Sequence, residues 1–176
     1  RAAAHWLADH RLFGRLLLPA AAAVEILSAA ARRQWAGRDL DLQGFTMHRP
    51  LVLPEAAEGA ASTAASWQVV LEPRADEGAE LSLYQRVDGA APAWQRIASA
   101  QARKAAPAST GADLLAAHAT ARAEPVTRVP AADVYRRFAT LGVEFGATFR
   151  VLGDIERGPS WAQAAVHLPQ ALAAVA

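Results

Sequence analysis

The feature that most constrains the fold is a single helical pattern near the start of the chain, at residues 20–35. Val24, Leu27 and Ala31 recur at helical spacing and predict a face that packs against the rest of the domain. Pro19 precedes the pattern and Gly37 follows it, so we expect the helix to begin after Pro19 and to end at Gly37. The packing face consists largely of small residues, which predicts that another element approaches it closely.

Strand candidates and turn signals follow this helix. The first strand candidate begins at residue 40 and is stopped by Pro50 and Pro54, and the other three are residues 66–72, 80–87 and 94–102. Turn signals at 76–78 and 88–89 separate the last three, which predicts antiparallel hairpins. One long helix followed by a meander of antiparallel strands is an α+β arrangement. It fits a hotdog fold, in which a strongly curved sheet wraps a single central helix.

The sequence changes character at residues 105–130, which are rich in proline, glycine and alanine. We interpret this stretch as a linker, with one short helix at 112–122. Helical spacing returns over residues 131–141 and ends at Gly142. Two further strands are predicted at 148–156 and 161–168.

The composition excludes several classes of function. The chain has no cysteine, so it has neither a disulfide framework nor a thiolate nucleophile. Lysine and arginine number 18 against 17 aspartate and glutamate residues, which leaves no electrostatic footprint for nucleic acid or an anionic membrane. No uninterrupted apolar stretch reaches the roughly 18–20 residues of a membrane span. We expect no nucleic acid and no membrane as partners, and a cytoplasmic location.

Two motifs suggest the chemistry. His10, Gly14 and Pro19 form the pattern H-x-x-x-G-x-x-x-x-P just before the predicted helix. A second motif combines Tyr135, Gly142 and the stretch Phe-Gly-Ala-Thr-Phe-Arg at residues 145–150. Occurring in this order, the two motifs resemble those of the dehydratase (DH) domains of modular polyketide synthases, which belong to the double-hotdog family.

The resemblance covers nearly the whole chain and implies a domain organisation. It implies an N-terminal hotdog carrying the first motif over residues 1–104, a linker over 105–130, and the start of a C-terminal hotdog over 131–176. The second hotdog is then incomplete, and the chain, which begins with Arg1, is expected to be truncated at both ends relative to a whole domain. Whole domains of this family often pair, so a homodimer is a further expectation.

The resemblance also implies a reaction, the dehydration of a β-hydroxyacyl thioester to an α,β-unsaturated thioester in polyketide biosynthesis. His10 is the expected general base, and histidine as a residue type suits this role because it titrates near neutral pH. The substrate is expected on the phosphopantetheine arm of an acyl carrier protein, which is a partner together with neighbouring synthase domains. The domain itself is expected to bind no cofactor and no metal. The residues expected to shape the substrate site are Gly14, Pro19, Tyr135, Gly142, Phe145 and Gly146.

Departures from the family pattern leave alternatives open. Phe145 stands where the family has tyrosine, and Ala147 where it has proline. The family's acid partner is an aspartate on the second helix, whereas this chain has no aspartate or glutamate after Glu156. The alternatives are a dehydratase-like cyclase that forms an oxygen heterocycle, a double-bond isomerase, and a catalytically silent scaffold domain. A single-hotdog thioesterase or hydratase is disfavoured by the linker and the second motif.

Overall fold

The computed structural model describes residues 5–36, 39–54, 66–75, 78–87, 93–105 and 126–169. The chain divides into two compact units, Arg1–Arg15 with Ser109–Ala176 (unit 1) and Leu16–Ala108 (unit 2). The first fifteen residues therefore group with the C-terminal part of the chain. The compact units are defined by contacts within the chain and need not coincide with the hotdog repeats. The domain boundaries at 104 and 131 therefore stay a prediction.

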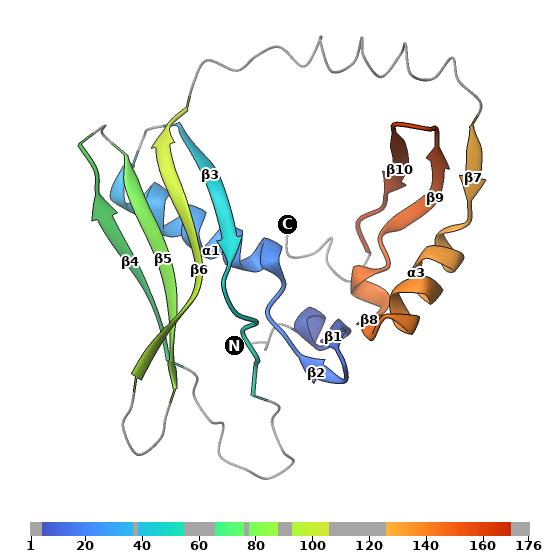
Figure 1. Ribbon diagram of the computed structural model, residues 1–176, viewed down its shortest axis with the longest axis horizontal. Coiled ribbons are helices and arrows are strands. Elements are labelled where there is room, and N and C mark those ends of the chain that lie inside the picture. Colours follow the sequence, from blue (N-terminus) through green and yellow to red (C-terminus); the bar gives the residue numbers. More distant parts are fainter. Residues whose placement is uncertain are drawn as a thin grey trace. The chain divides into compact units, whose positions relative to one another are not determined.

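Unit 2 contains a four-stranded antiparallel sheet with the strand order β3-β6-β5-β4 (Figure 1). The strands are β3 (Leu40–Met47), β4 (Trp67–Pro73), β5 (Ala79–Val87) and β6 (Ala93–Lys104). The register places Leu42 opposite Ala102 and Leu81 opposite Ala100. These bounds confirm the four predicted strands, although the first ends at Met47 and not at Pro50 and Pro54.

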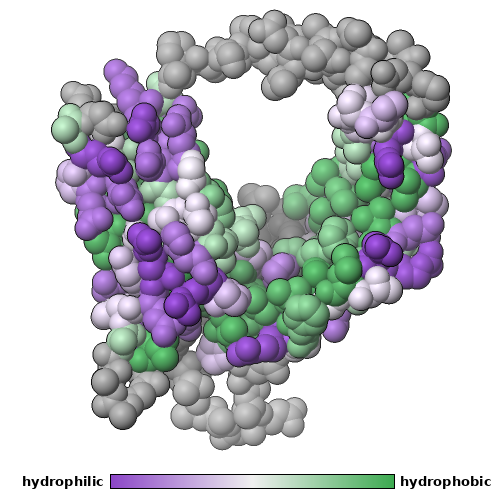
Figure 2. All heavy atoms as spheres, in the orientation of Figure 1, coloured by the Kyte–Doolittle hydropathy of each residue, from purple (hydrophilic) through white to green (hydrophobic). Residues whose placement is uncertain are grey.

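Helix α1 (Ala20–Gln34) packs against one face of this sheet and confirms the predicted helix. Its buried residues Ala23, Leu27 and Ala31 are at most 1 % exposed. The sheet contributes buried Leu81, Leu83 and Ile97, together with alanines whose small side chains allow the close approach. Figure 2 shows hydrophilic side chains over the opposite face of the sheet. Burial of each such leucine contributes roughly 1.5–3 kcal/mol, which makes this layer the core of unit 2.

Unit 1 is built from short elements. They are η1 (His5–Asp9), β1 (His10–Leu12), β2 (Arg15–Leu16, whose second residue belongs to unit 2), β7 (Thr127–Val129), α3 (Ala131–Thr140), β8 (Val143–Phe145), η2 (Ala147–Phe149), β9 (Leu152–Arg157) and β10 (Ala162–Val166). They form two three-stranded sheets with the orders β2-β1-β8 and β10-β9-β7. The sequence predicted α3 and the later strands but not β1, β2, β7 or β8.

One predicted strand is wrong in its first part. Residues 147–149 form the 3-10 helix η2, and β9 begins only at Leu152 rather than at residue 148. The reason is a contact across the sequence, because the carboxylate of Asp9 accepts a hydrogen bond from the backbone N–H of Thr148 within η2. The predicted helix at 112–122, the helix end at Gly37 and the turn at 88–89 lie outside the described residues.

Candidate active site

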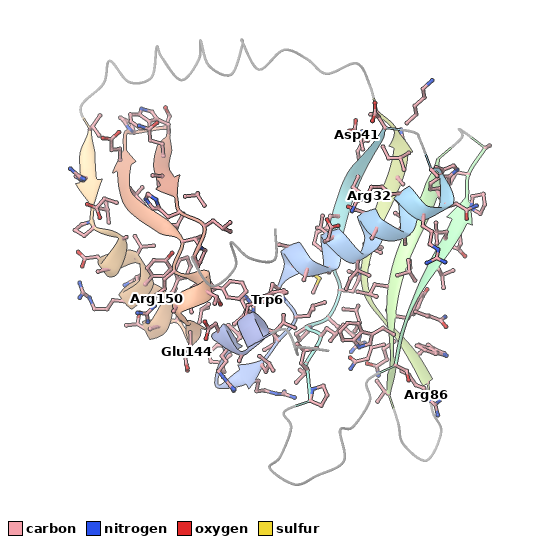
Figure 3. The ribbon with its side chains drawn as sticks, turned by 180° about the vertical axis from the view of Figure 1, so that it is seen from behind. Trp6, Arg32, Asp41, Arg86, Glu144 and Arg150 are labelled. Carbon is pink, nitrogen blue, oxygen red and sulfur yellow. The ribbon has the colours of Figure 1, made fainter. Side chains whose placement is uncertain are left out.

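His10 is the first residue of β1, and its strand pairs with the strand of the second motif. The antiparallel register places His10 opposite Phe145, Arg11 opposite Glu144 and Leu12 opposite Val143. In Figure 3, Trp6 marks η1 just before His10, and Glu144 marks β8. The fold therefore brings the His10 end of the first motif next to the second motif within unit 1.

Aromatic rings surround the half-buried imidazole of His10. Its ring centroid lies 5.7 Å from that of Phe145 and 5.1 Å from that of Phe149, with both rings tilted to it by about half a right angle. Phe145 and Phe149 stack at 6.1 Å, and Trp6 lies 6.0 Å from Phe149. These apolar walls restrict the orientations open to the imidazole.

Asp9 attaches the His10 strand to η2. Its Oδ2 accepts hydrogen bonds from the Thr148 backbone N–H at 2.9 Å and from the Thr148 hydroxyl at 2.8 Å. These bonds, helped by the charge of Arg150, hold the pKa of Asp9 below its usual range, although desolvation acts in the opposite direction. The sequence did not predict this contact, because Thr148 lies 139 residues after Asp9 and no local pattern indicates the pairing.

Gly14 lies in the two-residue turn that joins β1 to β2. Phe13 and Gly14 have φ angles of 49° and 73°, the combination required by a type I′ hairpin. The Arg11 guanidinium donates to the Gly14 carbonyl at 2.9 Å, and the Phe13 N–H donates to the Gly142 carbonyl at 2.7 Å. Gly142 has a φ of 79°, and the ring of Phe13 covers the position that a Cβ would take there.

Tyr135 on α3 faces the second motif. Its hydroxyl accepts a hydrogen bond from the Leu152 N–H at 2.9 Å and lies 3.3 Å from the Phe149 carbonyl, to which it donates. Its ring meets that of Phe145 edge to face at 6.1 Å. Both hydrogen bonds connect α3 to neighbouring backbone, so Tyr135 supports the aromatic wall next to His10.

Six of the seven predicted site residues therefore lie in unit 1, namely His10, Gly14, Tyr135, Gly142, Phe145 and Gly146. Pro19 lies in unit 2, where it is the residue just before α1 and its carbonyl accepts hydrogen bonds from Ala22 and Ala23. The structure thus gives Pro19 a local role in starting the helix, as expected from its fixed φ.

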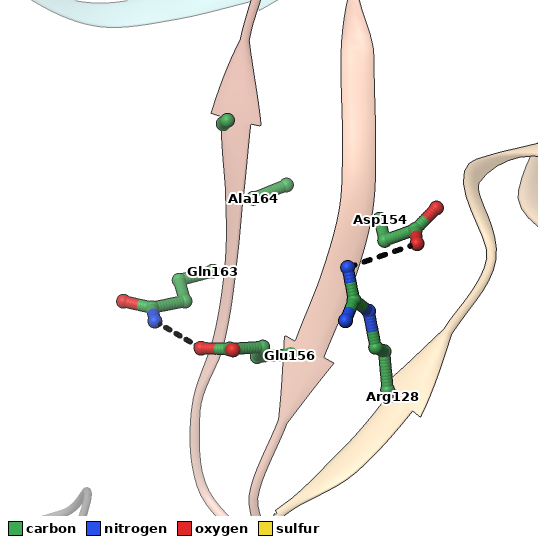
Figure 4. A pocket seen from close by; sticks show the side chains of 6 residues that line it. Arg128, Asp154, Glu156, Gln163 and Ala164 are labelled. Atoms are coloured by element: carbon green, nitrogen blue, oxygen red, sulfur yellow. Dashed lines mark hydrogen bonds and ion pairs between the residues drawn. The ribbon is translucent and has the colours of Figure 1, made fainter.

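Described residues of unit 1 also line two pockets. One, of about 280 Å³, is lined by the two sequence neighbours of His10, Asp9 and Arg11, and by residues of the C-terminal part of unit 1 that include Tyr135, Glu144 and Arg150. The other, of about 390 Å³, lies on the β7-β9-β10 sheet (Figure 4). There Arg128 pairs with Asp154 and Gln163 with Glu156, so its charged groups already have partners.

Among the residues that the structure describes, no group of three or more histidine, cysteine, aspartate or glutamate side chains has the arrangement of a metal site. None of the helices in the same residues has both the length and the apolar character needed to cross a membrane.

Comparison with protein families identifies the class to which this fold and site belong. A model described as the polyketide synthase dehydratase domain matches residues 1–86. A second, described as the polyketide synthase dehydratase N-terminal domain, matches residues 113–176. The chain belongs to the dehydratase domain family of modular polyketide synthases.

Individual relatives agree with this assignment. Polyketide synthase GfsB of Streptomyces halstedii is 34 % identical over 166 residues, which are 93 % of this chain and 3 % of that protein. Polyketide synthase ThaG of Burkholderia thailandensis is 30 % identical over 151 residues, 84 % of this chain and 2 % of that protein. The chain therefore spans only a small part of the synthases it matches.

Solved structures establish the fold. The dehydratase domain of the CurF module of the curacin polyketide synthase has a TM-score of 0.76 at 18 % identity, covering 97 % of this chain and 58 % of that one. The PpsC dehydratase domain of Mycobacterium tuberculosis, solved in complex with C12:1-CoA, has a TM-score of 0.73 at 19 % identity, covering 96 % and 55 %. The chain has the α+β double-hotdog fold with its second hotdog incomplete, and it spans little more than half of these domains.

Proposed function

We propose that this chain is the part of a polyketide synthase dehydratase that carries the catalytic base, and that His10 is that base. The whole domain converts a β-hydroxyacyl thioester to an α,β-unsaturated thioester. The substrate arrives on the phosphopantetheine arm of an acyl carrier protein, so the carrier protein and neighbouring synthase domains are the partners. The domain supplies no bound cofactor of its own to this reaction.

In this reaction His10 removes one proton from the substrate. A neutral imidazole nitrogen takes the proton from the α-carbon, and the C–H electron pair becomes the α,β double bond. The β-hydroxyl leaves as water after it receives a proton from a general acid of the whole domain. Negative charge that builds on the thioester carbonyl oxygen is stabilised by backbone N–H donors.

The observation that best supports this proposal is the pairing of His10 with Phe145. It joins two motifs that are far apart in the sequence and places the histidine against an apolar wall formed by Phe145 and Phe149. An imidazole held in this way is suited to taking a proton from a carbon atom, because that step requires the nitrogen to be aligned with the C–H bond.

Properties of related dehydratases support the same chemistry. Two CurK dehydratase structures are of inactive mutants, one with histidine replaced by phenylalanine and one with aspartate replaced by asparagine. The PpsC dehydratase domain was solved with an acyl-CoA, which is a thioester. A histidine and an aspartate acting on an acyl thioester fit the reaction proposed here, with His10 as the histidine.

The proposal is tested on the whole dehydratase domain, with its native ends, incubated with β-hydroxyacyl pantetheine thioesters of several chain lengths. Loss of water is followed by mass spectrometry for the wild type, His10→Ala and His48→Ala. His48 is the matched control, because its imidazole is hydrogen-bonded to Ser99 at 2.8 Å in unit 2. We expect His10→Ala to lower the rate by at least about 100-fold, within the range of general-base contributions, and His48→Ala to leave it unchanged.

Other outcomes point elsewhere. Unchanged dehydration by His10→Ala would overturn the assignment of the base. A wild-type domain that is inactive on every substrate would favour a silent scaffold. A product of dehydrated mass without an alkene signal by NMR would indicate cyclisation, and a shifted alkene would indicate isomerisation.

A further inference from the structure

We propose that Asp9 is a positioning residue for His10, acting through a clamp in which Asp9 holds Gly146 and Thr148. This inference rests on the proposed function, because it assigns the clamp to the orientation of the proposed base. The clamp joins the residue just before His10 to the segment that lies between the two phenylalanines flanking its ring.

Three hydrogen bonds form the clamp, and a fourth secures one of its partners. The Gly146 N–H donates to the Asp9 carbonyl at 2.8 Å. The Thr148 N–H and hydroxyl both donate to Asp9 Oδ2, at 2.9 and 2.8 Å. The Thr148 hydroxyl also lies 3.3 Å from the carbonyl of Trp6. The backbone and the side chain of Asp9 are thus both attached to η2 and to the residue before it.

The placement of the clamp explains why it acts on His10. Residues 146–148 lie between Phe145 and Phe149, whose rings are 5.7 and 5.1 Å from that of His10. Asp9 is bonded covalently to His10. Fixing Asp9 to residues 146–148 therefore fixes the Cα of His10 relative to both rings, and only the side-chain torsions of His10 remain to be set by packing.

Gly146 shows how closely the two segments approach. A Cβ at this position would lie 2.2 Å from the carboxyl carbon of Asp9 and 2.7 Å from its Cβ. Any side chain would push Asp9 away from Thr148, so glycine is required here by the space that Asp9 occupies. The carboxylate stays charged at neutral pH, since its hydrogen bonds and Arg150 lower its pKa, and a charged acceptor makes the stronger hydrogen bonds.

The test uses the whole dehydratase domain and four variants. Asp9→Ala removes the side-chain half of the clamp, Thr148→Val removes only the hydroxyl donor, and Thr148→Ser restores that donor. Asp154→Ala is the matched control in the same unit, because Asp154 also links two elements, accepting from the Ala131 N–H at 3.1 Å and pairing with Arg128.

Two readouts separate positioning from a general loss of stability. We expect Asp9→Ala to lower kcat by about 10- to 100-fold, the scale of a displacement of about 1 Å, while KM changes less than about threefold. Thr148→Val is expected to show a smaller loss of kcat that Thr148→Ser reverses. In NMR spectra of histidine-labelled domain, the His10 ring resonance, assigned with His10→Ala, is expected to move in Asp9→Ala as the ring currents of Phe145 and Phe149 weaken. Asp154→Ala should leave kcat and this resonance unchanged.

The failures of the two proposals are distinguishable. If His10→Ala is inactive but Asp9→Ala matches the wild type, or if Asp154→Ala loses as much kcat as Asp9→Ala, the clamp is overturned and the base assignment stands. If His10→Ala retains full activity, the proposed function fails. The resonance then still decides whether the clamp orients the ring, and an unmoved signal in Asp9→Ala overturns it.

Discussion

Substitution of Gly14 and Gly142 by alanine places the same methyl group on similar backbone conformations in different surroundings. The φ angles are 73° and 79°, both in the left-handed region. A Cβ at Gly14 meets nothing within 4 Å, whereas a Cβ at Gly142 would lie 2.3 Å from two ring carbons of Phe13. The pair therefore separates the cost of backbone strain from the cost of displacing a side chain.

The structure sets the size of both costs. A left-handed conformation costs a residue with a Cβ about 1–2 kcal/mol, which is the whole expected loss for Gly14→Ala. Phe13 is 75 % exposed, so its ring can swing into solvent and the residue loses only the contacts of its buried quarter. A quarter of about 200 Å² at about 25 cal/mol per Å² is roughly 1 kcal/mol. We therefore expect Gly142→Ala to be less stable than Gly14→Ala by about 1 kcal/mol, despite the close contact.

Urea unfolding of the whole domain measures both variants, with midpoints compared at an unchanged m value. Repeating Gly14→Ala and Gly142→Ala in a Phe13→Ala background removes the ring, and the difference between the two glycines should then vanish. A difference that persists without the ring, or one above about 3 kcal/mol with it, would refute the reasoning, because the ring would then be fixed rather than mobile.

Further predictions concern the core, the aromatic wall and acid stability. Leu27→Ala should cost about 2–5 kcal/mol in thermal or urea unfolding, because its side chain is 0 % exposed, whereas loss of the exposed Glu25 side chain should cost less than about 1 kcal/mol. Tyr135→Phe should cost about 1–2 kcal/mol by the same measurement, since it removes a hydroxyl with two backbone partners. The pKa of Asp9 is lowered in the folded state, so its contribution to stability is complete above the unfolded-state pKa and is lost as pH falls through the folded-state value. Asp9→Asn should therefore flatten the stability profile below about pH 4, which acid titration by circular dichroism can check.

Much of unit 2 was predictable because its structure follows local periodicity. The spacing of Leu27 and Ala31 predicted α1, and alternation with turn signals predicted the four strands, because an amphipathic helix and half-buried strands each leave their period in the sequence. Strands β1 and β8 show no such periodicity in the sequence. They have three residues each and are stabilised by pairing with each other, far along the chain.

The candidate site divides in the same way. His10 and the second motif were found because a family pattern fixes their spacing, and the structure then placed His10 opposite Phe145. The contact of Asp9 with Thr148 was missed because an aspartate next to a histidine in sequence says nothing about a partner so far along the chain. A partner of this kind becomes visible only when the fold is known.

The pairing of His10 with Phe145 has a consequence for the order of events during synthesis. Phe145 in β8, which lies opposite His10 in β1, is synthesised 135 residues after it. At about 5–20 residues per second, the ribosome takes roughly 7–27 seconds to make those residues. All of unit 2 is made within that interval, so its helix and sheet can form while β1 still lacks its neighbour β8. The histidine proposed as the base is therefore synthesised well before the residue that faces it in the neighbouring strand.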